Sequence, residues 1–480
     1  GLANPGTEAF LAEFAGIEIP AHKFLLVSVF GGGVSDFVGA TEILRPIADG
    51  FELNMSCPHA KGYGIQIGED EELVVAITRA VAAVKTVPVF VKLSATMRGL
   101  SSTAQAAIRA GAYGITLTNS IGPALAAVGE DAVLSNRYGG LTGDGIRPLG
   151  LRSVEQVREA IGPNPVIIGM GGIGSAEHVR QYRKAGADLF GVGSALTGMD
   201  SAALRAYFAR LQEQCSRGLS LAGEAAPLPH IDMSYYPSRL ASRSHFAPGL
   251  FRIQLERLPD QYQPGELAGR YFFLWMPGVG EKPFAIFSAA ERSVVVRTVG
   301  CFSGFLEEAP LGTPIFLRGP YGTALPGFEN RKLVLVGGGT GIASLLEIAC
   351  AYRATNEVLF LLGARTRDHF FDLDRFRELG TVLLSTDDGS AGYHGAVADL
   401  LRSEITAPQN QFTFINCGPE AMVQACFEIE RELVAPEHIW GAIEYMTSCG
   451  VGICGKCASP SGSLSCIDGP FMRRAEFTPR

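Results

Sequence analysis

Four cysteines near the end of the chain have a spacing that suits iron-sulfur chemistry. They are Cys449, Cys454, Cys457 and Cys466, in the order C-x4-C-x2-C-x8-C. Zinc sites favour two C-x2-C pairs, whereas C-x4-C-x2-C with a later fourth cysteine is typical of a 2Fe-2S cluster. Glycines between the first three cysteines would let backbone N–H groups turn toward the sulfurs. The spacing therefore predicts a 2Fe-2S cluster, with a zinc ribbon or a disulfide knot as alternatives.

Polar side chains stand at the ends of several short runs that predict β-strands. Cys57 directly follows the run FELNMS, Lys92 lies in VPVFVKLS, and Asn119 is near the end of YGITLTNS. Because α/β-barrel enzymes work at the carboxyl ends of their strands, these positions predict an active site. A thiol there could act as a base once its surroundings adjust its pKa. The alternative for Cys57 is a buried structural role.

Glycine-rich turns follow three of the predicted strands and suit phosphate binding. Two of them, GMGGIGS from Gly169 and GVGSAL from Gly191, lie in consecutive βα units. The third lies in LVLVGGGTGIASLLEIA, where Gly337 to Gly341 would open a helix whose free N–H groups attract a pyrophosphate. This third turn is not the G-x-G-x-x-G fingerprint, so its meaning depends on its surroundings.

Strands and helices that would position these residues alternate over about the first 197 positions. Six strand-like runs are separated by segments with apolar spacing near 3.6, such as EELVVAITRAVAAVK. The alternation predicts a parallel sheet with helices outside. A closed (β/α)8 barrel has eight strands, so we expect a barrel whose first two strands lie upstream of Gly1. The alternative is an open doubly wound sheet of six strands, but the two late glycine turns favour the barrel.

Two regions with different patterns follow a proline-rich connector. Between about 236 and 328, strand-like runs recur with almost no helical segments, which predicts a small antiparallel barrel. From 330 the βα alternation returns, and the cysteine motif closes the chain. We therefore expect an α/β nucleotide-binding domain and a small metal-binding domain after the antiparallel barrel.

The composition favours small-molecule partners. The chain has 40 Lys and Arg against 48 Asp and Glu, a formal net charge of −8, and no basic run that would indicate nucleic-acid binding. The longest apolar stretch, from Leu333, contains Glu347 and a glycine cluster, which suits a strand, a turn and a helix better than a membrane span. We expect a cytoplasmic protein whose ten cysteines are thiols or ligands. Because the N-terminus lacks both a signal-peptide pattern and an initiator Met, we expect the interior of a longer gene product.

Together these motifs resemble the NAD-linked, B-type dihydroorotate dehydrogenases. FELNMSC, VKLS, TNSIG and two glycine turns resemble the catalytic FMN subunit, while CGPEAM, CGVGICGKC and CIDGP resemble the electron-transfer subunit, which is of the ferredoxin-reductase type. The resemblance implies a fusion of two subunits and, by analogy, a homodimer. The implied domains are an incomplete FMN-binding (β/α) barrel over 1–200, a connector over 201–235, an antiparallel FAD-binding β-barrel over 236–329, an NAD-binding α/β domain over 330–435 and a 2Fe-2S domain over 436–480.

For the first half, the resemblance implies roles for single residues. Cys57 would be the base that removes the C5 proton of dihydroorotate while the C6 hydride passes to FMN, and Lys92 would stabilise the reduced flavin. The residues that would bind the pyrimidine are Asn54, Asn119, Ser120 and His59. The residues that would bind the cofactor are Gly143, Gly171, Gly172, Gly193 and Ser194.

For the second half, the resemblance implies FAD, NAD and the cluster. The FAD motif usually begins with Arg but here begins with Lys282, which lacks a bidentate fork. Asp387 and Asp388 near a ribose would favour NAD over NADP, although a solvated acidic turn is the alternative. The implied cofactor-binding residues are Lys282, Pro283, Phe284, Ser288, Gly322, Gly338, Gly339, Thr340, Gly341, Asp388, Cys417, Gly418 and Pro419. Electrons would pass from dihydroorotate through FMN, the 2Fe-2S cluster and FAD to NAD.

Other functions remain open at this point. His59 stands where the family usually has Asn, and a dihydropyrimidine dehydrogenase that reduces uracil or thymine is the nearest rival. That enzyme would use a loop cysteine as an acid rather than a base. A pure electron-transfer protein with an inert barrel, and a zinc-stabilised scaffold without a redox role, are rivals of other classes.

Overall fold

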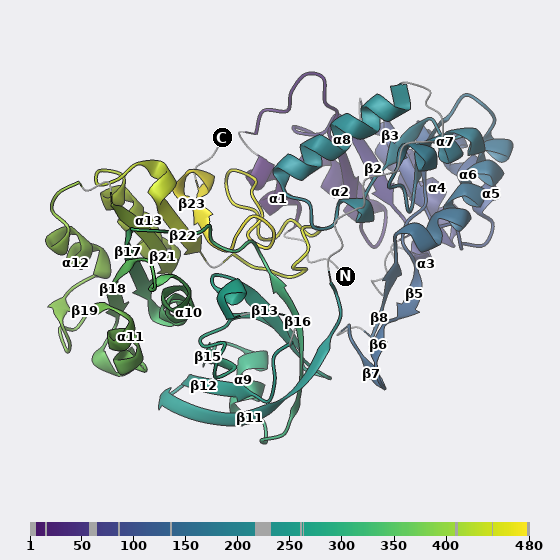
Figure 1. Ribbon diagram of the computed structural model, residues 1–480. Coiled ribbons are helices and arrows are strands. Elements are labelled where there is room, and N and C mark those ends of the chain that lie inside the picture. Colours follow the sequence, from purple (N-terminus) through teal and green to yellow (C-terminus); the bar gives the residue numbers. More distant parts are fainter. Residues whose placement is uncertain are drawn as a thin grey trace. The chain divides into compact units, whose positions relative to one another are not determined.

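A computed structural model of the chain forms two compact units (Figure 1). It describes residues 6–14, 17–56, 65–84, 87–134, 137–216, 232–259, 262, 264–408, 411–443 and 445–477. The first unit comprises residues 1–197 with 203–228, and the second comprises 198–202 with 229–480. No helix in the described ranges is long and apolar enough to cross a membrane.

The first unit is built on a parallel sheet whose six strands are neighbours in the order of the sequence. These strands are β1 (Leu26–Val29), β2 (Gly50–Asn54), β3 (Val89–Leu93), β4 (Gly114–Leu117), β9 (Val166–Met170) and β10 (Leu189–Gly191). A doubly wound sheet reverses its strand order at a switch point, and this order has no reversal. The structure therefore confirms the six expected strands and favours part of a barrel wall over the doubly wound alternative.

Helices and two small hairpins complete the first unit. The helices are α1 (Thr7–Phe14), α2 (Val34–Leu44), α3 (Ile65–Gly68), α4 (Glu71–Ala83), α5 (Leu100–Arg109), α6 (Arg147–Ile161), α7 (Ala176–Ala185) and α8 (Ser201–Ser216). The hairpins pair β5 (Ile121–Leu125) with β8 (Tyr138–Leu141), and β6 (Ala127–Val128) with β7 (Asp131–Ala132). These hairpins, which the sequence pattern did not predict, are inserted between β4 and α6.

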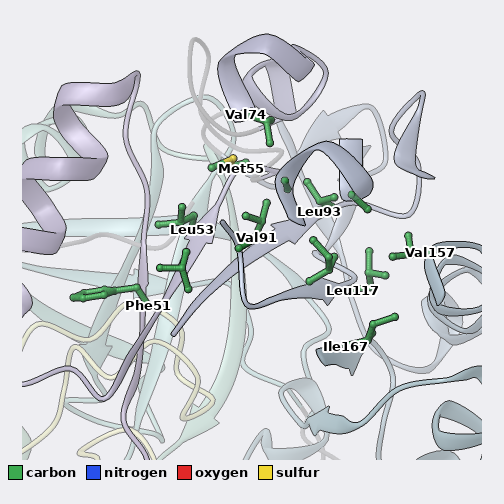
Figure 2. Packing of buried hydrophobic residues seen from close by; sticks show 14 of the residues in the cluster. Phe51, Leu53, Met55, Val74, Val91, Leu93, Leu117, Val157 and Ile167 are labelled. Atoms are coloured by element: carbon green, nitrogen blue, oxygen red, sulfur yellow. The ribbon is translucent and has the colours of Figure 1, made fainter. Parts of the chain in front are cut away.

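The two faces of the six-stranded sheet differ in polarity because side chains alternate along each strand. Phe51 and Leu53 on β2 are fully buried among apolar residues such as Val74 of α4 (Figure 2). Glu52 and Asn54 alternate with them along the strand and therefore point to the other face. The strand register pairs Ser28 with Glu52, and Asn54 with Lys92. One face thus forms the core against the helices, and the other carries polar groups side by side.

The second unit begins with an antiparallel sheet, as the sequence predicted. Its strands, in spatial order, are β14 (Gly280–Ala285), β13 (Tyr271–Met276), β16 (Pro314–Tyr321), β11 (Tyr236–Ala247), β12 (Leu250–Leu255) and β15 (Ser293–Arg297). Helix α9 (Cys301–Glu308) lies between β15 and β16 in the sequence. Alternate residues of this sheet, including Phe251, Phe272 and Leu317, form one apolar core.

A mainly parallel sheet follows in the same unit. Its strands, in spatial order, are β20 (Tyr393–His394), β19 (Thr381–Thr386), β18 (Glu357–Ala364), β17 (Lys332–Gly338), β21 (Phe412–Gly418), β22 (Ile439–Ile443) and β23 (Met472–Arg473), the last being antiparallel. Its helices are α10 (Ile342–Tyr352), α11 (Leu373–Leu379), α12 (Val397–Glu404) and α13 (Glu420–Glu430). The strand order reverses at β17, so a ligand crevice is expected where β17 and β21 end.

A carboxyl group is buried in the core beside β21. Glu430 on α13 has no exposed surface, and its Oε2 accepts a hydrogen bond of 2.9 Å from Asn416 Nδ2. Its Oε1 has no partner among the described residues. Burial raises the pKa of Glu430 to about 8, against the smaller opposing effects of Asn416 and Arg474. The carboxyl therefore holds a proton in the folded chain that it would lose in the unfolded chain.

We expect Glu430→Gln to remove a pH-dependent loss of stability. Because the folded state binds this proton more tightly, the free energy of unfolding falls as pH rises from about 4.5 to about 8. Glutamine has nearly the same shape as glutamate and cannot ionise. The free energy of unfolding of the variant should therefore exceed that of the wild type above pH 4.5, and the difference should stop growing above pH 8. The expected gain is on the order of a few kcal/mol. Calorimetric melting of both chains across this range measures it, and a constant difference would contradict the buried ionisation.

Candidate functional site

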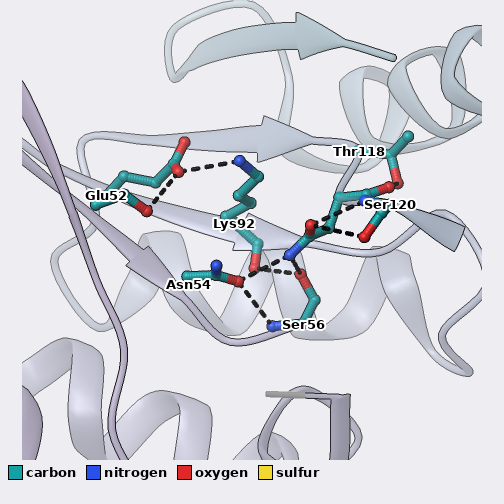
Figure 3. Close-up of polar contacts among 8 residues, drawn as sticks. Glu52, Asn54, Ser56, Lys92, Thr118 and Ser120 are labelled. Atoms are coloured by element: carbon teal, nitrogen blue, oxygen red, sulfur yellow. Dashed lines mark hydrogen bonds and ion pairs between the residues drawn. The ribbon is translucent and has the colours of Figure 1, made fainter. Parts of the chain in front are cut away.

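Polar residues meet at the carboxyl ends of β2, β3 and β4 (Figure 3). Asn119 Nδ2 donates to Asn54 Oδ1 at 2.8 Å and to Ser56 Oγ at 3.2 Å. Ser56 Oγ in turn donates to the carbonyl oxygen of Lys92 at 3.0 Å, and Ser120 N donates to Asn119 Oδ1 at 2.8 Å. The structure thus brings together the predicted pyrimidine ligands Asn54, Asn119 and Ser120. Fixed amides of this kind can orient a planar, hydrogen-bonding substrate.

Lys92 lies on the same polar face and is held by an acidic residue that the sequence reasoning missed. Lys92 Nζ is 3.1 Å from Glu52 Oε1, which also accepts a hydrogen bond of 2.9 Å from Ser28 Oγ. Both members of the pair are largely buried, with side-chain exposures of 16% and 6%. The sequence did offer a signal for Glu52, because an acidic residue within the otherwise apolar start of the strand FELNMS indicates a buried polar partner. The pair gives this face a cation whose position is fixed.

Cys57 and His59 lie outside the described residues. Their predicted roles as base and pyrimidine ligand stay predictions. The chain leads to them from Asn54 and Ser56, which belong to the polar group described above.

Three glycine-containing turns converge at the ends of β9 and β10. Gly171 and Gly172 have φ values of +114° and +70°, which side chains rarely adopt. A Cβ at Gly172 would lie 2.7 Å from the carbonyl oxygen of Gly143, and a Cβ at Gly143 would lie 3.7 Å from Ser194 Oγ. The predicted cofactor residues Gly143, Gly172 and Ser194 are therefore neighbours. Exposed N–H groups in such turns form a concavity suited to phosphate.

Two charged residues beside these turns were not predicted. Arg147 forms an ion pair with Asp144 and lies 2.7 Å from His178 Nε2. Gly174 N donates to His178 Nδ1 at 3.1 Å. Burial, and then the charge of Arg147, lowers the pKa of His178. Arg147 therefore supplies positive charge beside the glycine turns, while His178 tends to stay neutral.

The predicted FAD motif lies on β14 and in the turn that follows it. Lys282 is exposed, Pro283 and Phe284 are half-buried, and the buried Ser288 accepts a hydrogen bond of 3.1 Å from Arg375 Nη2. A Cβ at Gly322 would lie 2.4 Å from the carbonyl oxygen of Gly469, so this glycine allows close packing against the cysteine-rich tail. The helix α9 starts after Gly300, and its free N–H groups are a second candidate for phosphate binding that the sequence reasoning missed.

A cavity of about 270 Å³ lies at the reversal point of the parallel sheet. Its lining includes the predicted residues Gly338, Gly339, Thr340 and Pro419, together with Arg297 and Arg365. A Cβ at Gly341 would lie 2.3 Å from the carbonyl oxygen of Cys417, so the GGGTG and CGP turns touch. The two arginines, which were not predicted, add positive charge to a crevice that suits a dinucleotide.

The two acidic residues after β19 have different positions. Asp387 lines the cavity. Asp388 accepts hydrogen bonds from Ser390 N at 3.0 Å and Ser390 Oγ at 2.6 Å, and the Ser390 hydroxyl lowers its pKa. Asp388 therefore stabilises a turn, while Asp387 is the better placed of the two to meet a ribose.

The four cysteines of the tail interact with one another through their side chains. Cys449 interacts with both Cys454 and Cys466, and Cys466 also interacts with Cys457. Cys457 and Cys466 are almost fully buried. In the described part of the chain, no three His, Cys, Asp or Glu side chains surround a single ion position. A two-iron cluster takes four cysteine ligands, so this group of four interacting thiols fits it.

The loop that carries these cysteines has the backbone that the sequence predicted. Gly450, Gly452 and Gly455 have φ values of +77°, +74° and +70°. Val451 N points at Cys449 Sγ with a distance of 3.4 Å. Turned backbone N–H groups of this kind stabilise negatively charged sulfur.

A buried arginine fastens this loop to the antiparallel sheet. Arg318 on β16 is 2% exposed and donates to the carbonyl oxygen of Cys449 at 2.9 Å. It also forms a 2.7 Å ion pair with Glu281 and donates to Tyr321 Oη at 3.0 Å. Its guanidinium carbon lies 4.4 Å from the ring centroid of Phe273. Sequence reasoning missed Arg318 because its partners are distant in the chain.

Comparisons with known proteins cover both halves of the chain. Residues 1–213 match the family model described as dihydroorotate dehydrogenase, and residues 335–428 match an oxidoreductase NAD-binding domain. A probable dihydroorotate dehydrogenase B (NAD(+)) electron transfer subunit of Methanocaldococcus jannaschii is 35% identical over 213 residues, covering 44% of this chain and 79% of that protein. The chain belongs to the dihydroorotate dehydrogenase B family.

The first half of the chain is similar to the other subunit of the same family. A dihydroorotate dehydrogenase B catalytic subunit of Pyrococcus horikoshii is 40% identical over 197 residues, covering 41% of this chain. The chain spans 64% of the length of that relative. Among solved structures, an NADH-dependent reduced ferredoxin-NADP oxidoreductase has a TM-score of 0.42 and 26% identity, covering 52% of this chain and 90% of that one.

Membership of the dihydroorotate dehydrogenase B family confirms the resemblance drawn from the motifs. Both subunit types are represented in one chain, as expected. The family is one of oxidoreductases, and it implies flavin and NAD as cofactors.

Proposed function

We propose that this chain oxidises dihydroorotate to orotate and delivers the electrons to NAD. The observation that carries the proposal is the presence, in one chain, of both a dihydroorotate dehydrogenase half and an electron-transfer half. When bound, FMN and FAD would supply hydride transfer, and a 2Fe-2S cluster would carry single electrons between them.

In the first unit, the polar face would bind and orient the pyrimidine. Asn54 and Asn119 already fix each other through a 2.8 Å hydrogen bond, so they offer amide groups at set positions. Cys57, three residues after Asn54, would take the C5 proton of dihydroorotate. Lys92, held by Glu52, would place positive charge where negative charge develops on reduction. The converging turns of Gly143, Gly172 and Ser194 would hold the FMN phosphate.

In the second unit, the relay would end at the cavity between the GGGTG and CGP turns. Arg297 and Arg365 would neutralise pyrophosphate charge, and Asp387 would accept hydrogen bonds from a ribose hydroxyl. A carboxylate there would repel a 2′-phosphate, so the proposed acceptor is NAD rather than NADP. The four interacting thiols of the tail would hold the cluster.

Anaerobic mixing of the purified chain with dihydroorotate and NAD tests this function. Growth of the NADH absorbance band would support every step from the pyrimidine to the nicotinamide. A flat trace, in a chain that contains FMN, FAD, iron and sulfide, would overturn the substrate assignment. Uracil and NADH in the same assay test the dihydropyrimidine alternative.

A second candidate is an NADH-driven electron-transfer protein whose barrel is inert. The observation that favours it is that the electron-transfer half alone covers 79% of the length of its relative from Methanocaldococcus jannaschii. It predicts FAD without FMN in the purified chain, together with normal NADH oxidation by artificial acceptors. Flavin extraction and chromatography separate the two candidates, because the first requires both flavins in equal amounts.

We expect Gly172→Ala to weaken FMN retention by about tenfold or more. Its φ of +70° costs a side chain roughly 1–2 kcal/mol, and the new Cβ would press on the carbonyl oxygen of Gly143. FMN released on dialysis, measured by fluorescence, reports the effect. Gly145→Ala is the matched control, since a Cβ there meets no atom within 4 Å. Equal FMN loss from both variants would contradict the proposed phosphate turn.

A further inference from the structure

Three buried hydroxyl groups in the described part of the second unit have no hydrogen-bond partner, those of Tyr271, Ser293 and Ser385. Tyr271, on β13, is 6% exposed, and its Oη has no partner among the described residues. Its ring packs in an apolar cluster with Phe273, Cys457 and Cys466. Tyr271 therefore belongs to the same buried cluster as two of the four cysteines.

The hydroxyl of the neighbouring tyrosine has partners. Tyr321 belongs to the same apolar cluster, but its Oη donates to the carbonyl oxygen of Asp232 at 3.2 Å and accepts from Arg318 at 3.0 Å. Buried hydroxyl groups almost always have such partners, because a buried hydroxyl group without one has lost its hydrogen bonds to water and gained none in return. A missing partner next to cysteine sulfurs points to a group that the protein atoms alone do not include.

Sulfur is the acceptor that this site offers. A phenol with an ordinary pKa near 10 keeps its proton at neutral pH and can donate it. Thiolates and the sulfides of an iron-sulfur cluster carry negative charge and accept hydrogen bonds, and such bonds are among the features that set cluster potentials. The backbone of the loop already points Val451 N at the sulfur of another of the four cysteines, Cys449.

We propose that Tyr271 Oη donates a hydrogen bond to a sulfur on the Cys457 and Cys466 side of the 2Fe-2S cluster and thereby raises the reduction potential of the cluster. The proposal rests on the cluster in the proposed function. Tyr271 is thus a tuning residue: it neither ligates iron nor touches the substrate.

The direction follows from charge. Reduction adds one electron to the cluster, so a donor at its sulfur stabilises the reduced form more than the oxidised form. Removing the hydroxyl should shift the equilibrium for cluster reduction about tenfold toward the oxidised form, which for one electron is a fall of about 59 mV in the midpoint potential.

Tyr271→Phe in the full chain tests the proposal, because it removes only the hydroxyl. The readout is the midpoint potential of the cluster in an anaerobic redox titration followed by electron paramagnetic resonance. Tyr352→Phe is the matched control, since its hydroxyl donates to the carbonyl oxygen of Leu325 at 2.9 Å and lies outside the cysteine cluster. We expect a lower potential in Tyr271→Phe alone, with iron and sulfide contents equal in all three chains.

A second readout does not depend on the potential. Iron-sulfur stretching bands in the resonance Raman spectrum should shift between H2O and D2O, and part of that shift should vanish in Tyr271→Phe. If Tyr271→Phe contains the cluster and both its potential and its isotope shift are unchanged, the role of Tyr271 is overturned. The proposed function is not affected by that result. A wild-type chain, purified without oxygen, that holds no iron and sulfide would overturn the cluster and the inference with it.

Discussion

Replacing Cys457 by serine is expected to abolish electron transfer from dihydroorotate to NAD. Cys457 is almost fully buried and interacts with Cys466, so it would be a ligand at one iron. A serine oxygen is a harder ligand than thiolate and binds iron-sulfur clusters poorly. Loss of an outer-shell partner alone costs about 10- to 100-fold at metal sites, so loss of a ligand should cost more than about 100-fold. NADH formation and the iron content of the variant measure this.

A second activity separates loss of the cluster from loss of the fold. Reduction of ferricyanide by NADH requires only the cavity beside Gly338 and the FAD sheet, so Cys457→Ser should keep it. Cys350→Ser, which changes an exposed cysteine of α10, is the matched control and should keep both activities. If Cys457→Ser retains NADH formation from dihydroorotate, the proposed relay through the cluster is wrong.

Cys57→Ser is expected to slow the reduction of FMN by dihydroorotate by about 10²- to 10⁴-fold. This is the usual contribution of a positioned general acid or base. A serine hydroxyl is far less acidic than a thiol, so it would take the C5 proton only at a much higher pH. The bleaching of flavin absorbance in an anaerobic stopped-flow experiment gives the rate.

The same experiment has an internal control in the second unit. NADH should reduce FAD at the wild-type rate in Cys57→Ser, and Cys215→Ser on α8 should leave both rates unchanged. A Cys57→Ser chain that reduces FMN within about twofold of the wild-type rate would show that another group takes the proton, since a positioned base contributes far more.

Elements that depend on local pattern could be predicted from the sequence. Runs of β-branched and aromatic residues predict the six strands of the first unit. They also predict the antiparallel strands that begin at Tyr236. The inserted hairpin from Ile121 to Leu141 was missed because its strands are short, and IGPAL contains glycine and proline, which usually break strands.

Contacts between distant parts of the chain could not be predicted. The pairing of Glu52 with Lys92 depends on the register of β2 and β3, which the sequence does not state. Arg318 and Cys449 are 131 positions apart, and no local pattern relates them. Strand-end residues such as Asn54 and Asn119 were predictable because carboxyl ends of parallel strands meet at one edge, whereas the roles of Cys57 and His59 stay predictions.

The attachment of the tail by Arg318 bears on how the loop that carries the cysteines would hold the cluster. The guanidinium holds the Cys449 carbonyl against Phe273 and Tyr321 through contacts that involve no metal. Because these contacts involve no cysteine side chain, they would hold the backbone of the loop in the same position whether or not the cluster is bound. A loop held in this way would also move little when an electron arrives or leaves, which favours rapid electron transfer through the cluster.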